Sequence, residues 1–187
     1  MNSVTGIVLA GGQGRRMGGV DKGLQPLRGR TMVEAVLARL APQVDGIVIN
    51  ANQNLEAYAR FGHRVVPDAI GGFAGPLAGL HAGLKVASHS LVVTVPCDSP
   101  FLPEDLVKRL SLSLGHHDLA VAKTGEQPHP VFALVQKRCL ENLEAFLAGG
   151  GRKIDAWYAS LKVVEVNFDD EADAFRNINT QEELKSS

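Results

Sequence analysis

The chain has 187 residues, of which 45% are hydrophobic and 21% are charged, and its formal net charge at pH 7 is −1. This composition is typical of an ordinary globular protein and excludes the disordered and collagen-like classes. The near-balanced charge argues against a nucleic-acid-binding protein with a broad basic surface, so an anionic ligand has to be held by a local cluster.

The length suits one domain, and we expect it to span residues 1–187. No apolar run approaches the roughly 18 residues of a membrane span, and the first residues lack the pattern of a secretory signal. We therefore expect a cytoplasmic protein that binds neither membranes nor nucleic acid. The two cysteines, Cys97 and Cys139, lack the spacing of a zinc or redox site and are interpreted as small buried side chains.

The first predicted element is a short apolar run from Ile7 to Ala10, which is typical of a buried strand. The loop that follows holds five glycines together with Arg15, Arg16 and Lys22. Glycines let successive backbone N–H groups turn toward one anion, and the cations add mobile positive charge. The loop therefore predicts a polyphosphate site. A glycine-rich turn whose arginines face solvent is the alternative.

Two standard phosphate-binding motifs do not fit this loop. The dinucleotide fingerprint G-x-G-x-x-G/A fails at its last position, which is Met17, and no acidic residue ends the next strand. A P-loop requires Ser or Thr directly after Gly-Lys, whereas Lys22 lies between Asp21 and Gly23.

The loop resembles instead the opening of nucleotidyltransferases, L-A-G-G-x-G-x-R-M-G followed shortly by a lysine. Residues 9–18 match this motif with one extra arginine, and Lys22 follows. Within that group the pattern is similar to the molybdenum cofactor guanylyltransferases. This resemblance implies a Rossmann-like, three-layer αβα fold of the nucleotide-diphospho-sugar transferase type, with a mostly parallel central sheet.

Helices and strands alternate over the next residues. The predicted elements are a helix over 31–40 that opens on a capping box at Thr31 and Glu34, a strand over 47–49, a helix over 53–61 with Leu55, Tyr58 and Ala59 inward, and a strand over 64–67. This alternation predicts an α/β protein with a parallel sheet and helices on both faces. Ligands of such sheets lie at the carboxyl ends of the strands. We therefore expect the glycine loop, Asn50 and Asp68 to converge.

A second glycine-rich loop, residues 71–79, leads into a helix that contains Leu80 and Leu84. Its glycines allow a substrate to approach closely, but they fit helix entry and packing equally well. The resemblance favours the first reading, because related enzymes carry G-P-L-A-G at the position of residues 75–79 and place the second substrate against it.

Residues 91–95 form the most apolar predicted strand, and Asp98 follows at its carboxyl end. Mg²⁺ binds carboxylate oxygens together with substrate phosphates, so one aspartate suffices to recruit it. A cap of the turn before Pro100 is the alternative role for Asp98. The resemblance implies the metal ligand.

The rest of the chain continues the alternation. We expect a helix over 103–114, strands over 119–123 and 131–135 around a loop that contains His129, helices over 139–148 and 153–161, a strand over 163–168 and a capping box at Thr180 and Glu183. The acidic run 169–171 lacks the spacing of a calcium loop and is interpreted as a solvated turn.

The resemblance implies a Mg²⁺-dependent enzyme that transfers GMP from GTP to the terminal phosphate of molybdopterin and releases pyrophosphate. Proteins of molybdoenzyme maturation are its expected partners. The implied roles are nucleotide binding by Leu9, Ala10, Gly11, Gly12, Gly14, Lys22, Asn50, Asp68 and Asp98, catalysis by Arg16, Lys22 and Asp98, metal binding by Asp98, and contact with molybdopterin by Gly75, Gly79, Asn177 and Asn179.

Three other functions share part of this pattern. A sister nucleotidyltransferase, using CTP with molybdopterin or another nucleotide with a sugar phosphate, would have the same loop and Asp98. A dinucleotide-binding oxidoreductase is disfavoured by Met17 and by the missing acid after the second strand. A noncatalytic GTP-binding protein would bind nucleotide and form no product.

Overall fold

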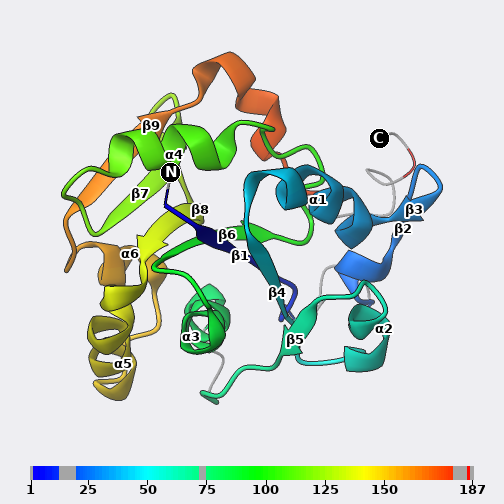
Figure 1. Ribbon diagram of the computed structural model, residues 1–187, viewed down its shortest axis with the longest axis horizontal. Coiled ribbons are helices and arrows are strands. Elements are labelled where there is room, and N and C mark those ends of the chain that lie inside the picture. The colour runs from blue at the N-terminus through cyan, green and yellow to red at the C-terminus, as the bar shows by residue number, and fades with distance from the viewer. Residues whose placement is uncertain (1, 13–19, 72–74, 179–184, 186–187) are drawn as a thin grey trace.

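The computed structural model describes residues 2–12, 20–71, 75–178 and 185. Within this part of the chain a seven-stranded sheet has the order β5-β4-β1-β6-β8-β7-β9 (Figure 1). Its strands are β1 (Val4–Leu9), β4 (Gly46–Asn50), β5 (Arg64–Val66), β6 (Leu91–Pro96), β7 (Leu119–Thr124), β8 (Gln127–Gln136) and β9 (Val163–Asn167). Within this seven-stranded sheet, as far as the structure describes it, only β8 runs antiparallel to its neighbours. The expected mostly parallel sheet is confirmed.

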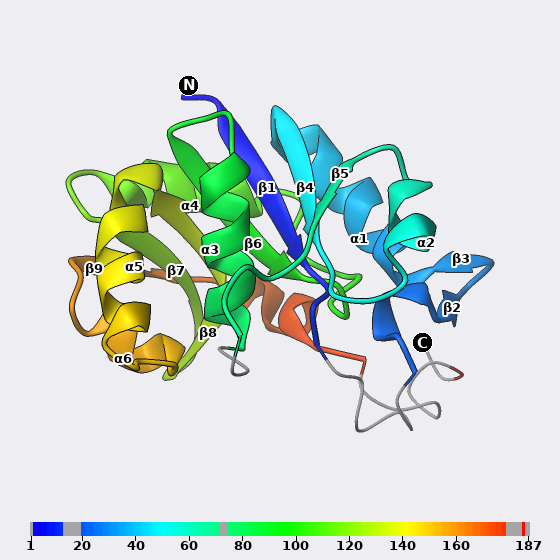
Figure 2. The same cartoon turned by 90° about the horizontal axis from the view of Figure 1, so that it is seen from below.

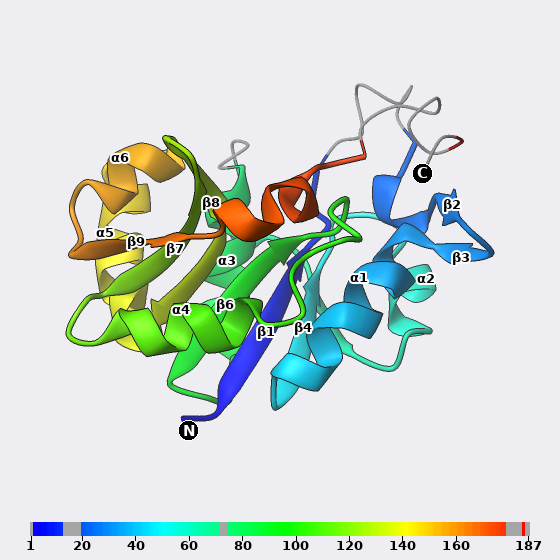
Figure 3. The same ribbon diagram turned by 90° about the horizontal axis from the view of Figure 1, so that it is seen from above.

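Helices cover both faces of the sheet (Figures 2 and 3). One face carries α1 (Met32–Leu40) and α4 (Leu106–Leu114), and the other carries α3 (Pro76–Val86), α5 (Leu140–Ala148) and α6 (Ile154–Tyr158). The short helix α2 (Leu55–Ala59) and the hairpin of β2 (Pro26–Leu27) and β3 (Arg30–Thr31) lie beyond the β5 edge of the sheet. The described 3₁₀ turns are η2 (Lys22–Leu24), η3 (Ala41–Gln43), η4 (Lys137–Cys139) and η5 (Asp169–Phe175). The three layers of the predicted fold are present.

Two apolar cores follow from the two faces of each strand. Along β1, Val8 packs with the residues of α1 and α4, whereas its neighbour Ile7 packs with those of α3 and α5. Successive side chains of a strand point to opposite faces, so one buried strand supplies both cores. At Gly83 a β-carbon would lie 2.1 Å from Ile7 Cδ1, which shows how closely α3 approaches the sheet.

Helix α2 differs from its prediction. It spans Leu55–Ala59, shorter than the expected 53–61, and only Tyr58 of the three residues expected inward is buried. Leu55 is 41% exposed, and Ala59 is exposed as well. A five-residue helix has little more than one turn, and one side chain in this case supplies its contact with the core.

The loop predicted around His129 is wrong. Strand β8 begins at Gln127, so a tight turn at Gly125 and Glu126 joins it directly to β7. Two prolines led to the loop prediction, yet β8 accommodates them where its register with β7 shifts at Val121. His129 stacks on Phe175 at 4.7 Å, and its burial lowers its pKa.

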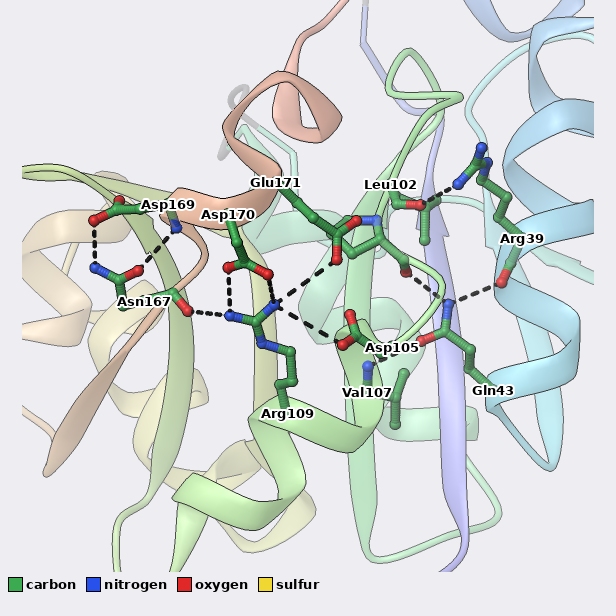
Figure 4. A network of polar contacts seen from close by, with 11 residues as sticks. Arg39, Gln43, Leu102, Asp105, Val107, Arg109, Asn167, Asp169, Asp170 and Glu171 are labelled. Atoms are coloured by element: carbon green, nitrogen blue, oxygen red, sulfur yellow. Dashed lines mark hydrogen bonds and ion pairs between the residues drawn. The ribbon is translucent and has the colours of Figure 1, made fainter.

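Helix α4 starts at Leu106, three residues after the predicted start, and Gln43 caps it. The Gln43 side chain accepts a hydrogen bond from Val107 N at 3.0 Å and donates one to the carbonyl oxygen of Pro103 at 2.9 Å (Figure 4). A residue of η3, the turn that follows α1, therefore satisfies a backbone donor that a helix leaves free at its amino end. The β2–β3 hairpin and this cap were not predicted.

The acidic run 169–171 is more than a solvated turn. It forms part of η5, and Asp170 accepts two hydrogen bonds of 2.9 Å from the guanidinium of Arg109 (Figure 4). Arg109 also donates to the carbonyl oxygen of Asn167 at 2.6 Å and lies 4.0 Å over the ring of Phe168. These bonds attach η5 to α4, and the guanidinium lowers the pKa of Asp170.

A cavity of about 370 Å³ is lined by Arg39, Glu104, Asp105 and Glu171. Figure 4 shows Arg39, Asp105 and Glu171 beside the network of Arg109. None of the predicted site residues that the structure describes is among its lining side chains. No helix in the described ranges has both the length and the apolar character needed to cross a bilayer.

The capping box of α1 gives a test of local stability. Thr31 Oγ1 accepts from Glu34 N, and the Glu34 carboxylate accepts from Thr31 N at 2.6 Å. We expect Thr31→Ala to lower the free energy of unfolding by about 1 kcal/mol. For a chain of this size that corresponds to a fall in Tm of about 2–4 °C, measured by calorimetry. Ser113→Ala, an exposed change in α4, is the control, and an equal fall in both variants would contradict the capping role.

Candidate active site

Backbone hydrogen bonds join the carboxyl ends of three neighbouring strands, β4, β1 and β6, beyond the last residues of β1 and β6. Ala10 N donates to the carbonyl oxygen of Asn50 at 2.8 Å, and Cys97 N donates to that of Leu9 at 3.1 Å. The glycine loop after β1 therefore starts between the ends of β4 and β6. Both cysteines are buried, as expected. Burial, and to a smaller extent the negative charge of Asp98, raises the pKa of the Cys97 thiol.

Polar side chains at the ends of β4 and β5 form one cluster beside this loop. Asn50 Nδ2 donates to Asp68 Oδ1 at 2.9 Å, and Asn52 Nδ2 donates to Asp68 Oδ2 at 3.0 Å and to the carbonyl oxygen of Gly11 at 3.1 Å. Asp68 N donates back to Asn52 Oδ1 at 2.8 Å. The predicted convergence of the glycine loop, Asn50 and Asp68 is confirmed. Asn52 was missed, although it lies two residues after Asn50 in the same strand exit.

Two of the predicted site glycines are required by close packing. A β-carbon at Gly11 would lie 2.8 Å from Asn50 Oδ1, and one at Gly79 would lie 2.4 Å from the same atom and 2.7 Å from Leu9 Cδ2. These contacts explain both glycines without a ligand. Gly79 is buried in α3, so the structure gives it a packing role, and its contact with a second substrate stays a prediction.

Gly12 and Gly75 have open space around them instead. A β-carbon at either position would meet no atom of the described residues within 4 Å. Gly75 has φ +56° and ψ −141°, a conformation that favours glycine, and directly precedes Pro76 at the start of α3. These two positions leave room for a ligand to approach the backbone.

Lys22, at the end of the glycine loop, and Asp98, after β6, form an ion pair. Lys22 Nζ lies 3.3 Å from Asp98 Oδ2, and the two side chains are 21% and 13% exposed. Asp98 Oδ1 has no hydrogen-bond donor in the described part of the chain. The predicted catalytic lysine and the predicted metal ligand are thus brought together from positions 76 residues apart.

Asp21 holds the segment that carries Lys22, a role that the sequence analysis missed. Its buried carboxylate accepts hydrogen bonds from Tyr58 Oη and, at 3.1 Å, from Asn54 Nδ2, and both donors belong to α2 or its cap. Gly23 leaves room for the tyrosine, because a β-carbon there would lie 2.4 Å from its hydroxyl oxygen. These hydrogen bonds from α2 and its cap to Asp21 position the backbone of the adjacent Lys22, and we call this contact the brace.

The C-terminal segment reaches the same place. Ile178 N donates to the carbonyl oxygen of Asp98 at 2.8 Å, and Ser99 Oγ donates to Asn177 Oδ1. Asn177, predicted to contact the second substrate, thus lies beside Asp98, and the fully buried Ser99 was missed. Gly14, Arg16 and Asn179 lie outside the described residues, as do Arg15 and the second capping box, and their predicted roles stay predictions.

The chain matches the family model of the MobA-like NTP transferase domain over residues 6–163. The chain belongs to this family. A molybdenum cofactor guanylyltransferase from Cupriavidus necator is 52% identical over 192 residues, which covers 99% of this chain and 96% of that protein. A protein of the same name from Shewanella amazonensis is 47% identical and covers 97% and 94%. The resemblance to this family is confirmed.

A solved structure supports the same family. Molybdopterin-guanine dinucleotide biosynthesis protein A from Archaeoglobus fulgidus superposes with a TM-score of 0.78 and 28% identity, over 97% of this chain and 95% of that one. The expected nucleotidyltransferase architecture is thereby confirmed.

The brace on Lys22 leads to a prediction. Tyr58→Phe removes one hydrogen-bond donor from the buried Asp21 carboxylate, which loosens the backbone that positions Lys22. We expect the dissociation constant for a nucleoside triphosphate to rise about fivefold, equivalent to about 1 kcal/mol. Isothermal titration calorimetry measures this change.

Tyr158→Phe is the matched control. Tyr158 also donates from a buried hydroxyl, to the carbonyl oxygen of Pro130, but it lies on α6. Both variants are expected to lose stability, whereas only Tyr58→Phe is expected to weaken nucleotide binding. Equal dissociation constants in the two variants would contradict the brace.

Proposed function

We propose that this protein transfers GMP from GTP to the terminal phosphate of molybdopterin, giving the molybdopterin guanine dinucleotide and pyrophosphate. The observation that carries the proposal is the ion pair between Lys22, at the end of the glycine loop, and Asp98. It occurs in a chain whose sequence is about half identical to molybdenum cofactor guanylyltransferases. An oxygen of the molybdopterin phosphate attacks the α-phosphorus of GTP. The bond from this phosphorus to the oxygen bridging the α- and β-phosphates breaks, and pyrophosphate leaves.

The protein contributes positioning and charge to this reaction. Backbone N–H groups after β1 bind the triphosphate, and the Lys22 ammonium neutralises the negative charge that grows on the leaving pyrophosphate. Asn50 and Asp68 orient the nucleoside. Asn177, beside Asp98, orients the acceptor, so the nucleophile and the α-phosphate meet at the ends of β1 and β6.

Mg²⁺ fits the side chains of this site. No group of three or more acidic, histidine or cysteine side chains exists among the described residues, so a cage made by the protein alone is not present there. Mg²⁺ needs only one or two carboxylates when substrate phosphates and water complete its shell. We propose that Asp98 holds the ion through Oδ1, since Oδ2 faces Lys22. When bound, the ion supplies Lewis-acid stabilisation of phosphate charge.

The test of this function is direct. The protein is incubated with molybdopterin, Mg²⁺ and GTP, CTP, ATP or UTP in turn, and products are identified by mass spectrometry and by pyrophosphate release. We expect a GMP adduct with GTP. A CMP adduct in its place would assign the protein to the sister reaction, and nucleotide binding without any adduct would make it a noncatalytic binder.

A substitution at Asp98 tests the metal role. Asp98→Asn keeps the shape of the side chain and an acceptor for Lys22 but removes the negative charge. We expect kcat to fall by at least about a hundredfold, as for the loss of one electrostatic contact to a transition state, while Tm stays within a few degrees. Asp155→Asn, on the exposed side of α6, is the control and should leave kcat unchanged. A Mg²⁺ dependence equal to that of the wild-type protein would contradict the assignment.

A further inference from the structure

Two arginines lie over one aromatic ring in the segment that follows Asp98. Arg176 Cζ is 4.4 Å from the centroid of the Phe101 ring, and Arg28 Cζ is 5.7 Å from it. Both arginines are exposed, whereas Phe101 is half-buried and packs against the small core cluster formed by Leu27, Met32 and Ile178. We name this group the Phe101 platform: Arg28, Phe101 and Arg176.

The platform is connected to Asp98 by short lengths of backbone. Phe101 follows Asp98 by three residues, and Arg176 directly precedes Asn177, whose side chain is bonded to Ser99. Ile178, the next residue, donates its N–H to the Asp98 carbonyl oxygen. Phe101 and the two guanidinium groups over its ring are therefore tied to the segment that carries Asp98.

The backbone at Arg28 is unusual for an arginine. Arg28 has φ +48° and Gly29 has φ +83°, and Leu27 pairs with Arg30 in the β2–β3 hairpin. A two-residue turn with both φ values positive is of type I′, where asparagine, aspartate or glycine is preferred at the first position. An arginine there is disfavoured, because its β-carbon crowds the backbone at a positive φ. Such a residue points to a role for its side chain.

A comparison with Arg109 shows what is different about the platform. Arg109 also lies over a ring, that of Phe168, but its N–H groups are bonded to Asp170 and to the Asn167 carbonyl oxygen (Figure 4). Within the described ranges, the side chains of Arg28 and Arg176 form neither an ion pair nor a hydrogen bond. A ring contact holds a guanidinium in place and leaves its N–H donors available.

We propose that the Phe101 platform is a phosphate-binding subsite for a substrate of the transferase. Two guanidinium groups held on one ring match the several oxygens of a phosphate, which arginine binds in a bidentate manner. The inference rests on the proposed function. Its phosphate comes either from the acceptor, whose chemistry here is a pterin monophosphate, or from the nucleotide triphosphate.

Equilibrium binding tests the subsite separately from turnover. Dissociation constants for GTP and for molybdopterin are measured one at a time by calorimetry, with the wild-type protein and with Arg28→Asn and Arg176→Ala. We expect a rise of roughly tenfold for one of the two ligands in each variant. A rise for molybdopterin assigns the subsite to the acceptor, and a rise for GTP assigns it to the nucleotide.

The choice of asparagine at position 28 keeps the turn intact. Asparagine suits a positive φ better than arginine does, so Arg28→Asn should be at least as stable as the wild-type protein. Arg64→Ala is the control, since Arg64 is an exposed arginine at the first residue of β5, and it should change neither constant.

Several outcomes would overturn the subsite. If the dissociation constants for GTP and molybdopterin are unchanged in Arg28→Asn and in Arg176→Ala, the two arginines have only a structural role. This holds whether or not Arg28→Asn has a higher Tm. Failure of the wild-type protein to bind either ligand would also overturn it. A wild-type protein that binds but makes no dinucleotide would refute the proposed function only, because the binding constants remain measurable.

Discussion

The hydrogen bonds and the ion pair at Asp98 are what the rest of the site depends on. Its carboxylate meets Lys22 from the glycine loop, and its carbonyl oxygen accepts the N–H of Ile178 from the C-terminal segment. Three pieces of chain that are far apart in the sequence are thus joined at one residue. Because every residue of β6 is buried, the strand that leads to this meeting point is anchored in the core.

At the ends of β4 and β5 the predicted site residues are held by close packing and by hydrogen bonds of side-chain amides. Asn50 contacts Gly79 of α3 and the start of the glycine loop at Gly11, and neither glycine has room for a β-carbon. Asp68 receives hydrogen bonds from the side chains of Asn50 and Asn52. The amide groups therefore fix both the loop and the helix that follows β5. The side chains that we propose for orienting the nucleoside therefore also pack the loop against the helix.

Arginine over an aromatic ring is used in two ways in this fold. Arg109 lies over Phe168 and satisfies its donors with acceptors of η5, so it anchors the C-terminal segment. Arg176, further along that segment, lies over Phe101 and keeps its donors available. The first arrangement attaches η5 to α4, and the second leaves two guanidinium groups exposed on one ring. The segment between them continues to Asn177 and Ile178, which are bonded to Ser99 and Asp98.

The sequence by itself determined the fold class and pointed to Lys22 and Asp98, which the structure places 3.3 Å apart. Alternating apolar segments forced strands and helices into layers, and parallel strands bring their carboxyl ends together, so Asn50, Asp68 and Asp98 were identified from position alone. Only the tertiary structure decided the neighbours of these residues. The brace from Tyr58 to Asp21, the contact between Ser99 and Asn177 and the platform on Phe101 each join segments far apart in the chain. Local propensity and spacing carry no information about such contacts, because they depend on how close two packed elements approach.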